Sequence, residues 1–276
     1  MRLGAPIYES YSDPAGWVAA LQRLQYRAAY CPEITPGFTP QDFAHAAGQA
    51  GILIAEVGVW NNPLHSDPVL RSQAIATCQQ KLALADEIGA QCCVNIAGSR
   101  GPKWDGPSAD DLTAETFDRI VETVRQIIDA VKPRRTFYTL ETMPWMYPDS
   151  TESYVRLLQA IDRPAFAVHF DPVNLICSPQ RYFANAALVT EFISNLGPRI
   201  KSVHAKDIIL RDHLTTHLDE ARPGLGALDY RTLLRQLNTL SPDLPVMVEH
   251  LPAAADYDQA VTYIRSLAAE INIPLY

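Results

Sequence analysis

Four short apolar runs in the second half of the chain each end in a side chain that can bind a hard metal ion. Each run holds about five or six β-prone residues, as expected of a buried parallel strand, and enough chain for one helix separates consecutive runs. Repeated strand-and-helix units bring the carboxyl ends of their strands to one rim. The side chains expected to meet there form the candidate active site: Glu141, Asp171, His204 and Glu249.

The rest of the chain continues the same alternation. Four earlier strands are predicted over 2–8, 28–32, 51–58 and 92–96. Helices are predicted from 13 onward and over 39–49, 67–88, 113–131, 150–160, 181–196, 228–240 and about 256–270. No glycine-rich phosphate fingerprint follows the first strand, which disfavours a doubly wound open sheet. Eight units predict an α/β fold, a single (β/α)8 TIM barrel domain over residues 1–276.

Composition narrows the class of protein. A chain of 276 residues that is 47% hydrophobic can bury one large core, and no linker divides it. The formal net charge of -8 disfavours binding to nucleic acid. A secretory signal and an apolar run long enough to span a membrane are both absent, so we expect a soluble cytoplasmic protein. Five cysteines without zinc-type spacing indicate free thiols.

Several motifs extend beyond the four candidate ligands. They are Leu140-Glu-Thr-Met-Pro144, Phe170-Asp-Pro-Val-Asn174, Val203-His-Ala-Lys-Asp207, Pro223-Gly-Leu-Gly226 and Val248-Glu-His250. With them, essentially the whole chain resembles the xylose isomerase-like TIM barrel superfamily, in particular its sugar phosphate isomerase and epimerase members. The resemblance implies that Glu141, Asp171, His204 and Glu249 ligate one divalent cation. Mn²⁺ is the first expectation for this oxygen-rich set, with Mg²⁺ or Co²⁺ as alternatives.

The resemblance also implies that Glu141 and Glu249 act as acid and base. A metal that chelates a ketose carbonyl and a neighbouring hydroxyl acidifies the C–H bond between them and stabilises the enediolate. One carboxylate then removes the proton and another returns it. We therefore predict a metal-dependent isomerase or epimerase that acts on a small carbohydrate, a ketose or keto-polyol.

Two other activities share this resemblance. If a β-hydroxyl or β-linked group leaves the enediolate, the same site becomes a lyase, as in inosose dehydratase-like or C-glycoside-cleaving members. An endonuclease IV-like nuclease is disfavoured, because Glu56 or Gly58, Asn95 and Asn174 stand where its additional zinc ligands would be. Tagatose 3-epimerase-like members have a histidine at the position of Asn174, so this chain departs from them there.

Further residues are predicted around the site. Trp60, Trp104 and Trp145 lie in loops after strands three to five, where an aromatic face either stacks on a sugar or packs against the barrel. His65, Asn174 and Lys206 are further predicted substrate contacts.

Supporting or structural roles are predicted for other residues near the motifs. His169 precedes Asp171 by two and shares its face, as a supporting or a core residue. His250 is expected to point away from the site. The segment 208–221 is expected to be a lid or a solvated loop. Members of the superfamily are often dimers or tetramers, which leaves a homo-oligomer open.

Overall fold

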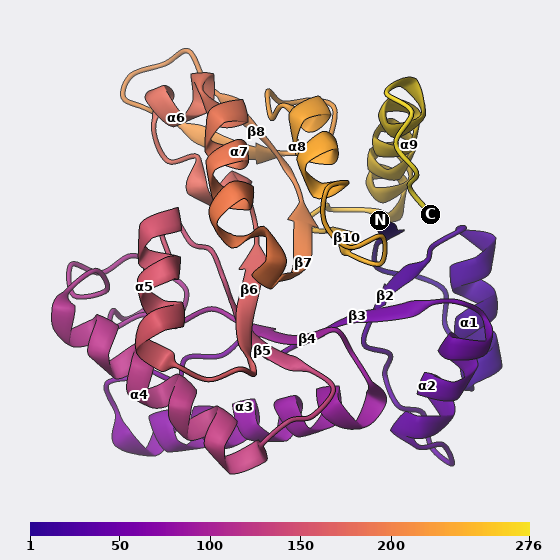
Figure 1. The fold of residues 1–276 in the computed structure, drawn as a ribbon, viewed down its shortest axis with the longest axis horizontal. Helices are drawn as coiled ribbons and strands as arrows, with labels where there is room; N and C mark the ends of the chain where they lie inside the picture. Colours follow the sequence, from indigo (N-terminus) through magenta and orange to yellow (C-terminus); the bar gives the residue numbers. More distant parts are fainter.

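Eight parallel strands alternate with helices along the chain in a computed structural model that describes residues 1–276 (Figure 1). The ladders connect the strands in the order β1-β10-β7-β6-β5-β4-β3-β2, a nearly closed barrel. The strands are β1 (Arg2–Gly4), β2 (Ala28–Tyr30), β3 (Leu53–Gly58), β4 (Cys92–Asn95), β5 (Phe137–Glu141), β6 (Phe166–Phe170), β7 (Ile200–Ala205) and β10 (Pro245–Val248). The predicted (β/α)8 TIM barrel is confirmed.

The seam between β1 and β2 brings the two ends of the sheet together. The N–H of Arg27 donates to the carbonyl oxygen of Leu3 at 3.1 Å. A Cβ on Gly4 would lie only 2.2 Å from the carbonyl oxygen of Ala28. A side chain at Gly4 would therefore force the two strands apart, and glycine permits the close approach.

Helices form the outer layer and begin where the sequence signals predict. Asp13, Thr39 and Asp67 each cap a helix whose first residue is proline. The main helices are α1 (Pro14–Arg23), α2 (Pro40–Gln49), α3 (Pro68–Ile88), α4 (Ala114–Val131), α5 (Thr151–Ile161), α7 (Asn185–Leu196), α8 (Tyr230–Leu237) and α9 (Ala254–Glu270). None of them combines the length and apolar character needed to cross a membrane.

One predicted helix is divided in two. The segment 181–196 was expected to be continuous, but α6 (Pro179–Phe183) ends before α7 begins, because Ala184 has the non-helical angles φ -114° and ψ 24°. The side chain of Asn185 donates to the carbonyl oxygens of Tyr182 and Ala227. A tertiary contact to a distant loop thus accompanies the break, and local helix propensity did not reveal it.

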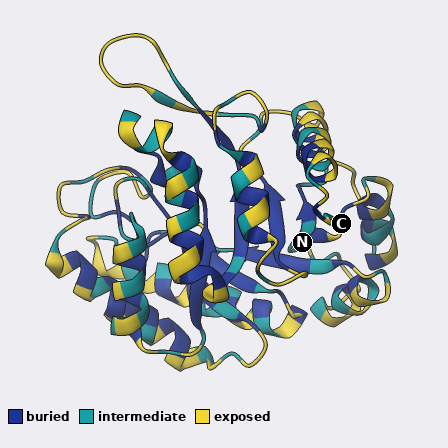
Figure 2. Ribbon diagram, turned by 45° about the horizontal axis from the view of Figure 1, so that its top comes forward, coloured by how far each residue is buried: buried dark blue, intermediate teal, exposed yellow.

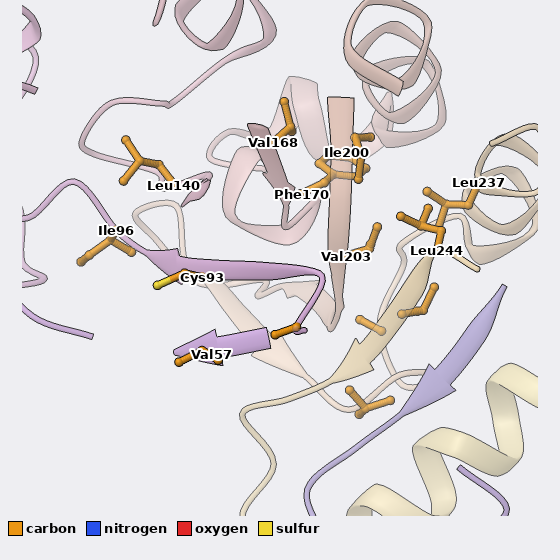
Figure 3. Close-up of a cluster of buried hydrophobic side chains, with 14 of the residues drawn as sticks. Val57, Cys93, Ile96, Leu140, Val168, Phe170, Ile200, Val203, Leu237 and Leu244 are labelled. Carbon is orange, nitrogen blue, oxygen red and sulfur yellow. The ribbon is translucent and has the colours of Figure 1, made fainter. Parts of the chain in front are cut away.

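The hydrophobic core lies between the outer face of the barrel and the helices. Figure 2 shows the strands buried and the outer helix faces exposed. Figure 3 shows Leu140, Phe170 and Val203 among the core side chains, on the strand faces opposite to the candidate ligands. The inner face holds apolar side chains such as Met247 together with polar groups, including Glu56 and His169, both almost fully buried. Buried polar side chains in a barrel interior that is usually packed with apolar layers indicate where to look for a site.

The segment after β7, expected to be a lid or a solvated loop, forms a regular hairpin. Antiparallel strands β8 (Asp207–Leu210) and β9 (Leu218–Ala221) pair in register, and residues 211–217 at the tip are exposed. Figure 2 shows a long exposed loop that extends beyond the barrel. The base is anchored by the carboxylate of Asp207, which accepts N–H groups from Ile208, Gly224, Gly226 and Leu228.

Candidate metal centre and active site

The four predicted ligands meet at the carboxyl ends of β5, β6, β7 and β10. One ligand atom from each of Glu141, Asp171, His204 and Glu249 lies within 4.8 Å of the others, and all four residues are buried. The Nδ1 atom of His204 is 3.1 Å from Oε1 of Glu141 and 2.9 Å from Oε1 of Glu249. We refer to these four side chains as the carboxylate cluster.

The register of the sheet explains why these side chains converge. Paired residues of parallel strands point to the same face, and the face repeats every two residues. Glu141 on β5 is paired with His169 on β6, so Asp171, two residues further, has the same orientation. His204 on β7 is paired with Met247 on β10, which gives Glu249 the same orientation in turn. All four side chains therefore point to the barrel axis.

The cluster has the charge and donor chemistry of a divalent cation site. Its three carboxylates and one imidazole suit Mn²⁺, Mg²⁺ or Co²⁺. Oδ2 of Asp171 and Oε1 of Glu249 are buried, and Lys206 and His204 are the donor side chains that approach them. Burial raises the pKa of Asp171 to about 7, although nearby Lys206 opposes this shift. Lys206 brings one positive charge to the three carboxylates, and a divalent cation would offset the negative charge that remains.

Lys206 supplies a single positive charge at the edge of the cluster. Its Nζ atom lies 2.7 Å from Oδ2 of Asp171, 2.9 Å from Oε1 of Glu249 and 3.0 Å from Oε1 of Glu220. Burial alone would lower the pKa of Lys206, but these carboxylates raise it well above its ordinary value. The ammonium group is therefore a charged donor beside the cluster.

Asn174 contacts both the cluster and Lys206. Its Nδ2 group donates to Oε1 of Glu141 at 3.1 Å and to the carbonyl oxygen of Thr142 at 3.1 Å. Its Oδ1 atom lies 3.5 Å from Nζ of Lys206. Asn174 also lines the cavity above the cluster, so it can both orient Glu141 and contact a bound molecule.

A second polar layer lies beneath the cluster, and of its members only His169 was predicted, as a supporting or a core residue. Glu56 of β3 is almost fully buried, and its Oε1 atom accepts hydrogen bonds from Oγ of Ser202 and from Nε2 of His169 at 3.1 Å. Its Oε2 atom lies 3.2 Å from Nε2 of His204. Burial by itself would raise the pKa of Glu56, but His204 and His169 lower it below its ordinary range. Glu56 is thus a charged acceptor beneath the cluster.

The contact with Glu56 determines which nitrogen of His204 faces the cluster. A proton on Nε2 is held by Glu56, so Nδ1 is directed toward Glu141 and Glu249. Carboxylate–histidine pairs of this kind orient the imidazole of metal ligands. Glu56, His169 and His204 also lie close enough together to hold an ion, but the oxygens of Glu56 already contact three donor groups. Glu56 could have been noticed as the one charged residue within the apolar run of β3.

A cavity of about 1100 Å³ opens above the cluster, and all three predicted loop tryptophans line it. The ring of Trp60 lies 6.3 Å from the imidazole of His204, between centroids. Gly58 leaves room for that indole, because a Cβ there would lie 2.3 Å from its Nε1 atom. Trp145 donates from Nε1 to the carbonyl oxygen of Asp105 at 2.9 Å, which ties together the loops after β4 and β5.

Other residues that line the cavity were not predicted from the sequence. Tyr8 and Tyr11 follow β1, Tyr30 ends β2, and Glu220 reaches the cavity from the hairpin. The prediction that His250 points away from the site is wrong. Its φ of +57° turns the chain after β10 toward the cavity, and its Nδ1 atom lies 3.2 Å from Oε2 of Glu220.

One predicted substrate contact lies outside the cavity lining. His65 is not brought together with the others, since its Nδ1 atom accepts the N–H of Asp67 at 3.0 Å at the start of α3.

Comparison with known proteins agrees with the barrel. The family model described as xylose isomerase-like TIM barrel matches residues 13–267. A search of curated protein sequences found no match. A solved D-tagatose 3-epimerase-like protein is similar over 99% of this chain and 98% of its own, with a TM-score of 0.71 and 17% identity.

Two other proteins of similar structure, an epimerase and a probable dehydratase, are described with different activities. D-Psicose 3-epimerase from Clostridium cellulolyticum H10, solved with D-tagatose, covers 99% of this chain and 100% of its own, with a TM-score of 0.70 and 13% identity. A probable 3-DHS dehydratase involved in petrobactin synthesis in Bacillus anthracis covers 96% and 98%, with a TM-score of 0.69 and 15% identity. At these identities the similarity establishes the shared fold.

Proposed function

The chain belongs to the xylose isomerase-like TIM barrel family, and from that premise we propose that it is a divalent-metal-dependent isomerase or epimerase acting on a ketose or keto-polyol. The observation that carries the proposal is the pair of carboxylates, Glu141 and Glu249. Both approach Nδ1 of His204 within about 3 Å, from strands on opposite sides of β7, at the floor of a large cavity. Two such groups can address one carbon from two directions.

The bound cation is assigned to the carboxylate cluster on its donor chemistry. Glu141, Asp171, His204 and Glu249 would hold it, with Mn²⁺ preferred and Mg²⁺ or Co²⁺ as alternatives. When bound, it would polarise a substrate carbonyl and offset the negative charge of the enediolate. Three buried carboxylates share the single ammonium of Lys206, and this excess of negative charge supports the assignment.

The side chains of the protein then move the proton. One of Glu141 and Glu249 removes it from the carbon next to the carbonyl, and the other returns it. Return to the same carbon on the opposite face gives an epimer, whereas return to the neighbouring carbon gives an isomer. The ammonium of Lys206 lies 2.9 Å from Glu249 and can donate a hydrogen bond to a substrate oxygen that develops negative charge.

A lyase is the second candidate, and the surroundings of Glu249 favour it. Lys206 and His250 both border the cavity and lie 3.4 Å apart, Nζ to Nδ1. Either can protonate a leaving hydroxyl or alkoxide at the β-carbon. The dehydratase with the same fold is consistent with this alternative.

Deuterium exchange separates the two candidates. The Mn²⁺-loaded protein is incubated in D₂O with ketoses, inososes and 3-keto-glycosides, and products are followed by NMR and mass spectrometry. Deuterium bound to carbon without loss of a group supports the isomerase or epimerase, whereas loss of water or an aglycone supports the lyase. If no compound shows either deuterium exchange or loss of a group, despite stoichiometric metal, both candidates are contradicted.

Matched variants connect the reaction to the cluster. Glu141→Gln should lose both bound Mn²⁺ and exchange, because it removes one of three anionic ligands. Glu122→Gln changes an exposed carboxylate on α4 and should retain both properties. Full metal occupancy and full exchange in Glu141→Gln would refute the role assigned to this residue.

A further inference from the structure

The cavity is much larger than the single sugar ring that the proposed reaction requires. A pyranose has about twelve heavy atoms, and even at the roughly 30 Å³ of a liquid water molecule each, it fills about 360 Å³. The cavity measures about 1100 Å³ and is continuous from the cluster to the surface. Roughly two thirds of its volume therefore remains for a second part of the substrate.

The lining changes in character from the floor of the cavity to its opening. At the floor, Lys206 is 2% exposed and Glu141 is 4% exposed. Toward solvent, large aromatic side chains remain uncovered: Tyr8 is 58% exposed, and Trp104 and Trp145 are each 37% exposed. We call these last three residues the aromatic rim. Exposed aromatic side chains that gather around a cavity mark a binding surface for a flat apolar face.

The aromatic rim is held in place before any molecule binds. Trp145 is hydrogen-bonded to the carbonyl oxygen of Asp105, which neighbours Trp104 in the loop after β4. Tyr8 packs on Tyr257 of α9, with 5.8 Å between ring centroids. Rigid aromatic side chains lose little conformational entropy when they bind a ring.

The charges of the lining disfavour an anionic substrate. Lys103 and Lys206 are the lysines that border the cavity, and both are ion-paired, Lys103 with Asp105 at 3.0 Å. No arginine borders it, while the acidic residues of the lining are Glu9, Glu33, Asp105, Glu141, Glu220 and Glu249. A phosphate or carboxylate group would find no free cation in this lining.

We propose that the substrate is a neutral keto-glycoside with two rings, in which the keto-sugar ring lies at the carboxylate cluster and the second ring packs against the aromatic rim. The second ring is either another sugar or an aromatic aglycone, since both present the flat C–H or π face that such side chains bind. This inference rests on the proposed function and specifies its substrate class.

Solvent deuterium incorporation with paired probes tests the inference. The Mn²⁺-loaded protein is assayed with 3-keto-glucose, phenyl 3-keto-β-glucoside, 3-keto-cellobiose and 3-keto-glucose 6-phosphate. We expect kcat/KM to be at least about tenfold higher for one of the two-ring probes than for 3-keto-glucose, and lowest for the phosphate. The better of the two-ring probes identifies the second ring as aromatic or sugar.

Variants locate the source of the preference. Trp104→Ala should reduce the ratio of kcat/KM between the two-ring and one-ring probes by about tenfold. Phe183→Ala removes an exposed aromatic residue of α6 outside the cavity and should leave the ratio unchanged.

The outcomes distinguish this inference from the proposed function. Equal kcat/KM for one-ring and two-ring probes, or a preference for the phosphate, overturns the two-ring inference while the metal-dependent reaction stands. A ratio that Trp104→Ala leaves unchanged also overturns it. Exchange with none of the probes, with metal bound, refutes the proposed function and this inference with it.

Discussion

Glu56→Gln should weaken metal binding although Glu56 is not a predicted ligand. The carboxylate contacts Nε2 of both His169 and His204 and the hydroxyl of Ser202. Glutamine has nearly the same shape, but it replaces one acceptor oxygen with an NH₂ donor and removes the charge. If the NH₂ group faces His204, the imidazole must move its proton from Nε2 to Nδ1. The ligating nitrogen then presents a proton to the site.

The size of the effect follows from the position of this contact. Loss of a partner that orients a metal-ligating histidine typically costs about 10- to 100-fold in metal affinity. This corresponds to about 1.4 to 2.7 kcal/mol of binding free energy. The amide can also turn its oxygen toward His204 and its NH₂ group toward His169, whose Nδ1 atom has no partner and can take the proton. That arrangement preserves the tautomer of His204, so we expect the lower part of the range.

The assay is competitive titration of Mn²⁺ against a fluorescent chelator, with thermal melting to verify folding. Ser202→Ala is the matched control, because it removes one donor to the same carboxylate and leaves its charge and its contact with His204 intact. We expect the control to bind Mn²⁺ clearly more tightly than Glu56→Gln. A folded Glu56→Gln protein whose affinity lies within about twofold of the parent would refute the reasoning.

Three further predictions test other parts of the structure. Cys177 is the one exposed cysteine, so brief alkylation of the native protein at pH 8 should modify it first. The assay is peptide mass spectrometry, and labelling of the buried thiols at the same rate would contradict their burial. Gly226→Ala places a Cβ 2.3 Å from Oδ1 of Asp207 and should destabilise the protein by about 1 to 3 kcal/mol in a denaturant melt, whereas Gly48→Ala, with open space around it, should not. The backbone N–H of Thr39, the N-cap residue of α2, donates a hydrogen bond to the carboxylate of Asp42. This hydrogen bond lowers the pKa of Asp42. Asp42 therefore stabilises the folded protein above the pKa that it has in the unfolded chain, and this stabilisation is lost as the pH falls through its lower pKa in the folded protein. An NMR titration midpoint of Asp42 at or above the ordinary aspartate pKa would disprove this prediction.

The alternation of strands and helices was readable from the sequence because it depends on local properties. Apolar runs, N-cap residues and prolines at helix starts act over a few neighbouring residues, as at Asp67 and Pro68. The convergence of Glu141, Asp171, His204 and Glu249 was also predictable, because parallel strands in repeated units must end on one rim.

The contacts around these ligands depended on tertiary structure. Glu56 and His204 are 148 positions apart, and only the register of the intervening strands places them 3.2 Å from each other. The left-handed backbone at His250 and the hairpin that carries Glu220 bring two more groups to the cavity. A sequence pattern specifies the face of a strand on which a side chain lies, whereas the packing of distant segments determines which residues that side chain contacts. The candidate ligand set was therefore present in the sequence, while its support and the shape of its cavity were decided by the fold.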